Sequence, residues 1–300
     1  AMMRILGIVG VQICICVPII VFQFCKGKEF FSKEYWGYAL RIGIPIVPHY
    51  LSGIILNQGD RIMIDKMVGK TEVALYGLAY SIGMLVQLFI SGMNSALTPW
   101  MYSKIKKGDI RSMRKVLQLL SVVVVGIAVA LMLISPELVL IFGSPKYREA
   151  VYVIPPVAAS VFFIFIYNIL SMPQFYYEKT QFLMAASMAA AGANVVLNFI
   201  FIRLFGYIAA GYTTLACYML YSVGHYIVSK RILVNEGIQE NLMNPGFLVA
   251  CSVFLIGASI ICNLIFPYRI LRYAILLASA GLVFWKKELL LKTMADIRKK

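Results

Sequence analysis

The sequence has 300 residues, of which 61% are hydrophobic and 14% are charged, and its mean hydropathy is +0.83. Soluble domains of this length are less apolar, so the composition excludes an ordinary soluble protein and favours one built in a bilayer. The net charge of +15 comes mostly from basic residues in short connections between apolar runs. Because these residues form no patch with interleaved aromatics, we predict that the chain has no nucleic-acid partner.

Apolar runs long enough to cross a hydrocarbon core of about 30 Å recur along the whole chain. Nine can be drawn, at residues 5–25, 38–60, 73–98, 116–134, 151–172, 181–202, 207–228, 247–265 and 268–285. The expected fold is therefore all-α, a polytopic membrane helix bundle with about nine transmembrane helices.

The orientation follows from the basic residues, which gather in every second connection. These groups lie at residues 26–33, 104–115, 179, 230–231 and 286–300. The positive-inside rule makes that side cytoplasmic, so Ala1 is expected outside and Lys300 inside. Residues 135–150 are then an outer loop, and the basic tail from Lys286 rests on anionic membrane lipid.

The second apolar run, together with the residues that follow it, carries a polar stripe at helical spacing. Its members include His49, Asn57, Asp60 and Arg61. A charged side chain at membrane depth costs about 2.5–3.5 kcal/mol or more, so it faces protein or water and not lipid. This stripe predicts a helix that lines a cavity.

The third run shows a longer polar face, with Tyr76, Tyr80, Gln87 and Asn94 at steps of three, four or seven. Weaker polar stripes mark the fifth, sixth and seventh runs, where Ser, Thr and Asn can equally serve as contacts between helices. The fourth, eighth and ninth runs are apolar nearly all round, which suits lipid-facing positions. We therefore expect runs two, three, five, six and seven to surround a wet interior, with the other three at the periphery.

No pattern for a metal, a cofactor or an active site is present in the sequence. The six cysteines lie in or at the ends of apolar runs without metal-ligand spacing, so they are interpreted as small buried hydrophobic residues. The two histidines, His49 and His225, lie in separate runs and are more often packing residues than ligands. We predict that the chain is not an enzyme.

The run IPIVPHYLSGIILNQGDRIMIDKMVG, followed by ALYGLAYSIG and NSALTPWMYSKIKKGD, resembles a known family. It is similar to the lipid-linked oligosaccharide flippases for O-antigen and capsular polysaccharide, in the multidrug/oligosaccharidyl-lipid/polysaccharide exporter superfamily. FYYEKT and NVVLNFIFIRLFGYIAAGYTT extend the likeness to about residue 230.

The resemblance implies two six-helix lobes around a central cavity. Residues 1–34 then correspond to the last helix of the N-terminal lobe and a cytoplasmic linker, and residues 35–240 to the C-terminal six-helix lobe. Residues 241–300 add two transmembrane helices and a basic tail. Since most of the first lobe is missing, the chain is expected to be a fragment that needs that lobe or a second copy.

The resemblance also implies a function, which is flipping of a polyprenyl-diphosphate-linked glycan across the bacterial cytoplasmic membrane for polysaccharide biosynthesis. The expected substrate-binding residues are Arg61, Asp60, Asn57, His49, Tyr76, Tyr80, Gln87 and Asn94, with Arg61 on the diphosphate. A multidrug or cation antiporter of the same superfamily and a non-transporting membrane scaffold are the alternatives. For Arg61 the competing hypothesis is structural, either an ion pair with Asp65 or support of the helix end.

Overall fold

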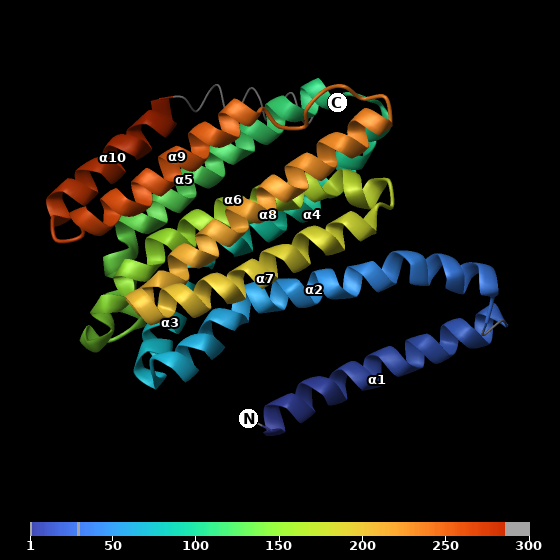
Figure 1. The fold of residues 1–300 in the computed structure, drawn as a ribbon, viewed down its shortest axis with the longest axis horizontal. Coiled ribbons are helices and arrows are strands. Elements are labelled where there is room, and N and C mark those ends of the chain that lie inside the picture. Colours follow the sequence, from blue (N-terminus) through green and yellow to red (C-terminus); the bar gives the residue numbers. More distant parts are fainter. Residues whose placement is uncertain (1, 29–30, 286–300) are drawn as a thin grey trace. The chain divides into compact units, whose positions relative to one another are not determined.

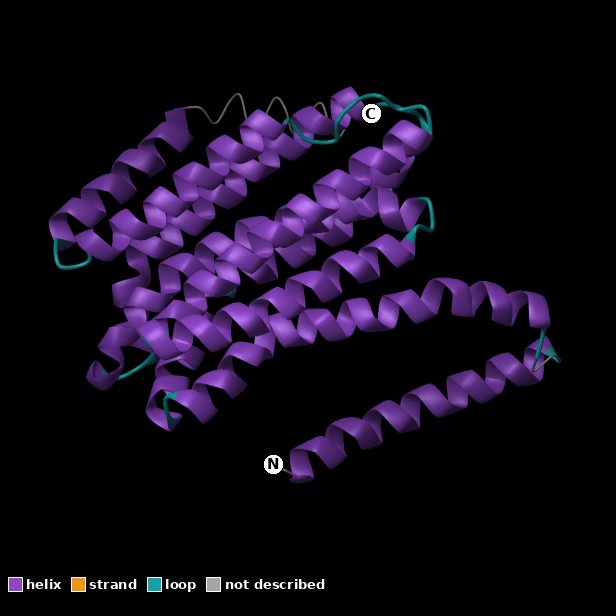
Figure 2. Cartoon of the chain, in the orientation of Figure 1, coloured by secondary structure: helices purple, strands orange, loops and turns teal. Residues whose placement is uncertain are grey.

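The computed structural model describes residues 2–28 and 31–285, and these residues form helices joined by short connections (Figure 2). The helices are α1 (Met2–Gly27), α2 (Lys33–Met67), α3 (Lys70–Gly83), α4 (Leu85–Lys106), α5 (Ile110–Phe142), the 3₁₀ helix η1 (Pro145–Val153), α6 (Ile154–Tyr176), α7 (Thr180–Phe205), α8 (Ile208–Asn235), α9 (Pro245–Ile265) and α10 (Arg269–Trp285). No strand occurs in the described residues, so the prediction of an all-α bundle is confirmed.

All nine predicted apolar runs are helical, and the described chain has seven stretches that are long and apolar enough to cross a membrane. The runs predicted at 207–228 and 268–285 fall in α8 and α10, which are not among these seven. The protein is therefore a multi-pass membrane protein. The predicted basic tail from Lys286 lies outside the described residues.

The chain divides into two compact units, residues 1–44 and residues 45–300, and each is described by itself. The first unit contains α1, where no residue of the apolar stretch Leu6–Gly27 is buried. Cys14, Cys16 and Cys25 are accordingly exposed, so the prediction that the cysteines are buried is wrong for these three. Cysteine is a small apolar side chain, so it suits a lipid-facing helix surface as well as a protein interior.

In the second unit, α6 is the most buried helix and packs against α3, α4, α5, α8 and α9, while α7 packs on α8 (Figure 1). Helix α5 also contacts α9 and α10, so the prediction that the fourth run lies at the periphery is wrong. Hydrocarbon and a protein interior are both apolar, so an apolar helix surface does not reveal which of them it faces.

The third predicted run is not one helix, because it breaks between α3 and α4 at Met84. Gly83 lies against α6, and a Cβ atom at this position would come within 2.6 Å of the Cγ1 atom of Val157. The absence of a side chain at Gly83 therefore allows the end of α3 to approach α6 closely. The predicted continuous polar face is divided between two helices.

The predicted outer loop at residues 135–150 is almost entirely helical. Helix α5 continues past Pro136, which has no N–H to donate to the carbonyl of Met132 four residues earlier. The Ser135 hydroxyl donates to this carbonyl instead, at 2.7 Å. The helix therefore tolerates its proline and ends at Phe142.

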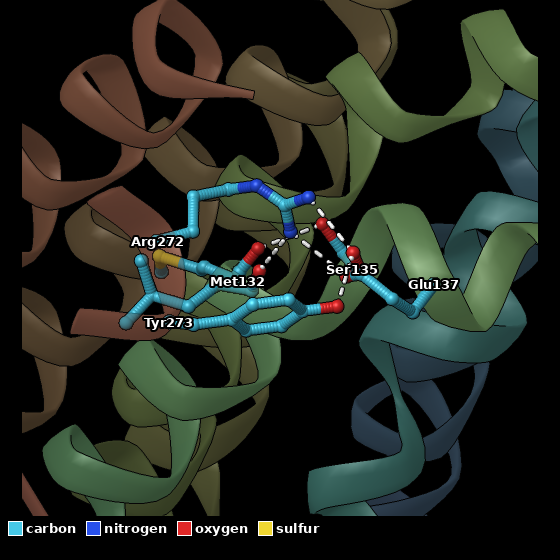
Figure 3. A network of polar contacts seen from close by, with 6 residues as sticks. Met132, Ser135, Glu137, Arg272 and Tyr273 are labelled. Carbon is cyan, nitrogen blue, oxygen red and sulfur yellow. Dashed lines mark hydrogen bonds and ion pairs between the residues drawn. The ribbon is translucent and has the colours of Figure 1, made fainter. Parts of the chain in front are cut away.

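Next to this proline, an ion pair joins α10 to α5 (Figure 3). Arg272 is buried and donates both terminal nitrogens to the Glu137 carboxylate at 2.8 Å, and one of them also to the carbonyl of Leu133 at 2.7 Å. The Tyr273 hydroxyl donates to the same carboxylate at 2.9 Å. A bidentate pair of this kind fixes the orientation of the last described helix on α5.

Candidate functional site

A polar cavity of about 730 Å³ lies within the second unit, between α2, α3, α6 and α8. Its polar lining consists of His49, Tyr50, Asn57, Gln58 and Arg61 of α2, Tyr80 and Ser81 of α3, Tyr167, Asn168 and Ser171 of α6, and Tyr218 and Tyr221 of α8. His49, Gly53, Asn57 and Arg61 lie four residues apart, which places them on one face of α2. Four of the eight predicted site residues, His49, Asn57, Arg61 and Tyr80, line this cavity.

Arg61 brings a positive charge to the cavity. One terminal nitrogen lies 3.3 Å from Oε1 of Gln58, and the guanidinium carbon is 5.2 Å from the centre of the Tyr80 ring. Within the part of the chain that the structure describes, no carboxylate pairs with Arg61, and Asp65 is exposed. The structure therefore contains no Arg61–Asp65 ion pair, and the guanidinium retains donors for an anion.

Asn57 connects three helices at the wall of the cavity. Its side-chain oxygen accepts hydrogen bonds from the hydroxyls of Tyr80 at 2.8 Å and Tyr218 at 3.4 Å. Its amide nitrogen donates to the carbonyl of Gly53 at 2.8 Å. Two of the tyrosines that line the cavity, Tyr80 and Tyr218, are thus held in place by a residue of α2.

Asp60 lies behind this wall and not in it. Its carboxylate is fully buried and accepts hydrogen bonds from the hydroxyls of Tyr76 at 2.5 Å and Thr214 at 2.7 Å, and from the Asn198 amide at 2.5 Å. Thr213 in turn donates to the side-chain oxygen of Asn198. Asp60 and Tyr76 therefore belong to a buried network that joins α2, α3, α7 and α8.

The other end of the cavity is aromatic. The Tyr221 hydroxyl lies 3.1 Å from Nδ1 of His49, and the ring centres of Tyr167 and Tyr221 are 4.5 Å apart. His225 stacks on Tyr167 outside the lining, with its Nδ1 atom 2.8 Å from the Gln174 amide nitrogen. The set of predicted site residues omitted Tyr167, Tyr218 and Tyr221, although each lies on a polar stripe visible in the sequence.

Gln87 and Asn94, like Asp60 and Tyr76, are predicted site residues that do not line the cavity. Both lie on α4, beyond the break at Met84, and neither belongs to the lining. Within the described residues, Oε1 of Gln87 is buried without a hydrogen-bond partner. Their assignment as substrate ligands remains a prediction.

The chemistry of the lining suits an anionic, hydroxyl-rich ligand. Arg61 can bind a phosphate with two parallel hydrogen bonds, and the tyrosine, asparagine and serine side chains can bind sugar hydroxyls. Among the described residues, no aspartate or glutamate lines the cavity. The same part of the chain holds no group of three or more His, Cys, Asp or Glu side chains that could bind a metal ion.

Comparison with known proteins connects this architecture to glycan synthesis. Residues 5–106 match the sequence model of the polysaccharide biosynthesis protein family. The chain is 28% identical over 172 residues to a protein of Haemophilus influenzae named for the Lsg locus, covering 54% of this chain and 41% of that protein. It is 29% identical over 167 residues to an uncharacterized membrane protein of the same organism, covering 52% and 40%. No solved structure matches the chain.

The chain thus spans less than half the length of these two relatives. The region matched by the family model includes α1, α2, α3 and α4, and therefore His49, Asn57, Arg61 and Tyr80. The resemblance predicted from the sequence is confirmed over residues 5–106, and this multi-pass membrane protein is similar there to the polysaccharide biosynthesis protein family.

Proposed function

We propose that this chain is part of a transporter that flips a polyprenyl-diphosphate-linked oligosaccharide across the bacterial cytoplasmic membrane. The diphosphate binds Arg61, the glycan lies against the polar lining of the cavity, and the polyprenyl chain stays in the lipid. The partner is the N-terminal lobe of the same protein or a second copy of this chain. The basic connections and the C-terminus face the cytoplasm.

The observation that carries this proposal is a guanidinium in a cavity lined in part by α2, α3 and α6, which belong to stretches apolar enough to cross a membrane. This guanidinium has no carboxylate partner among the described residues. A cation at this depth is costly unless an anion or water meets it, and Arg provides a planar fork that fits phosphate oxygens. The matches to the polysaccharide biosynthesis family and to a protein of the Lsg locus support a role in glycan synthesis.

A cation or drug antiporter of the same fold is less well supported. Such a transporter needs an acidic group in contact with its substrate, whereas Asp60 accepts three hydrogen bonds outside the cavity lining. The alternative of a membrane scaffold without transport activity has no specific observation in its favour. A scaffold does not require a cavity with an unpaired cation, so this role would leave the cavity around Arg61 unexplained.

Substitutions at Arg61 test the proposal in a transporter that contains this chain together with the other lobe. Arg61→Gln removes the charge, so glycan export should be lost while the amount of protein in the membrane stays normal. Arg61→Lys retains the charge without the fork, so export should be partial. The measurements are the amounts of exported glycan and of membrane-inserted protein.

Asp65→Asn is the matched control on the same helix. Because Asp65 is exposed and no ion pair joins it to Arg61 in the described residues, this variant should export normally. Normal export by Arg61→Gln would remove Arg61 from the mechanism. A loss of membrane protein in both Arg61→Gln and Asp65→Asn would instead indicate a structural pair.

A further inference from the structure

A second hollow, of about 170 Å³, lies between α6, α8 and α9. Its walls are almost entirely apolar and include Phe163, Ile166, Val223, Tyr226, Leu248 and Val249. Val223 and Val249 are 56% and 61% exposed. The hollow is therefore a groove that opens on the apolar outer surface of the helices, where bilayer hydrocarbon is the surrounding medium.

The groove is separate from the polar cavity. Helix α6 presents Phe163 and Ile166 to the groove but Tyr167 and Ser171 to the cavity. The Ser222 hydroxyl of α8 lies 2.9 Å from the carbonyl of Phe163 and joins the two helices between the groove and the cavity. A ligand whose headgroup occupies the cavity therefore cannot place its chain in the groove without crossing the layer formed by α6 and α8.

One end of the groove lies beside the most basic connection in the described chain. The groove reaches Pro245 in the first turn of α9. Just before that turn, the carbonyl of Asn241 accepts a hydrogen bond from Nε of Arg114 at 2.7 Å, and Glu240 pairs with the same arginine at 3.3 Å. Arg114 lies in the first turns of α5, so these contacts bring the junction of α4 and α5 to this end of the groove. The exposed basic residues of this junction are Lys106 at the end of α4, Lys107 in the connection, and Arg111 and Lys115 at the start of α5.

We propose that the groove binds one acyl chain of an anionic phospholipid, whose phosphate lies at the basic connection between α4 and α5. The acyl chain fills the apolar hollow between α8 and α9. The lysine and arginine side chains attract the phosphate headgroup, as clustered basic residues do at an anionic membrane surface. The bound lipid fills the gap between α9 and the six-helix lobe. This site is independent of the proposed flipping activity.

A photoreactive lipid tests the proposal on the purified 300-residue chain in nanodiscs. The probe is phosphatidylglycerol with a diazirine in one acyl chain, and labelled peptides are mapped by mass spectrometry. Labelling is expected at the groove walls on α6, α8 and α9, severalfold above that obtained with the matching phosphatidylcholine probe. Equal labelling by the two probes would overturn the preference for an anionic lipid.

Two tryptophan variants of α9 form a matched pair. Val249→Trp fills the groove and should reduce labelling severalfold, whereas Val253→Trp alters an equally exposed residue outside the lining and should leave labelling unchanged. Equal labelling of the unsubstituted chain, Val249→Trp and Val253→Trp would overturn the proposal. Absence of labelling in the groove, because residues 286–300 or a second copy of the chain occupy it, would also overturn it. If undecaprenyl phosphate displaced the photoreactive probe and unlabelled phosphatidylglycerol did not, the groove would be assigned to the glycan carrier. That result would also overturn the proposal.

Discussion

Asp60 and Arg61 are adjacent in sequence but serve different parts of the structure. Successive residues of a helix point about 100° apart, so one side chain enters the interior where α2, α3, α7 and α8 meet, and the other enters the cavity. A carboxylate in the cavity would repel a diphosphate. Its burial behind the wall leaves Arg61 as the charged side chain in the described cavity lining, as the proposed diphosphate site requires.

Replacement of Asp60 tests whether its network stabilises the fold. Asp60→Ala leaves the Tyr76 and Thr214 hydroxyls and the Asn198 amide without their acceptor. One buried donor left unsatisfied costs about 1–3 kcal/mol, so this variant should unfold at a clearly lower temperature in detergent. Asp65→Ala, at an exposed position on the same helix, should change the free energy of unfolding by about 0.5 kcal/mol or less. Equal melting temperatures for the two variants would contradict a structural role for Asp60.

At the scale of the helices, the break between α3 and α4 separates the polar residues that reach the site from those that do not. Tyr76 and Tyr80 precede the break and reach Asp60 and Asn57, whereas Gln87 follows it and does not line the cavity. The close approach of Gly83 to Val157 holds the end of α3 against α6. The break therefore separates two groups of polar residues that the sequence places on one stripe.

Two glycines of α3 allow this approach to be tested. Gly83→Ala introduces a methyl group within 2.6 Å of Val157, so α3 or α6 must shift and the melting temperature should fall. Gly77→Ala has no atom within 4 Å of the new methyl group, and should be neutral or stabilising by up to about 1 kcal/mol because alanine favours helix. Thermal unfolding followed by circular dichroism compares the two. A Gly83→Ala protein as stable as the Gly77→Ala protein would show that the close contact is unimportant.

At the scale of the whole molecule, the predicted orientation in the membrane rests on the basic connections and can be tested directly. In a cysteine-free background, Lys146→Cys on η1 should react with a membrane-impermeant thiol reagent in intact cells, because this residue is exposed in the short region between α5 and α6. Lys107→Cys, which is exposed in the basic connection between α4 and α5, should react only after permeabilisation. The opposite pattern would invert the predicted topology.

The class of the fold and the main features of the site follow from the sequence alone. The nine apolar runs that hydropathy marks are all helical, because a membrane span must be both apolar and of a fixed length. Hydropathy misses η1, which lies largely in the predicted outer loop, and the break between α3 and α4. The stripe on α2 correctly places His49, Asn57 and Arg61 together on the cavity wall, since four-residue steps stay on one helix face.

Tertiary packing decided which helix faces are buried and which polar residues line the cavity. An apolar helix such as α5 has the same sequence character whether it faces lipid or protein, so only the structure shows it packed against α6 and α9. Polar residues have two possible uses in a membrane, lining a cavity or joining helices, and the sequence does not distinguish them. Contacts between α2, α3, α7 and α8 place Asp60 and Tyr76 in the protein interior between these helices. Tyr167, Tyr218 and Tyr221 line the cavity instead. Which of the two uses a polar residue has depends on which helix faces meet.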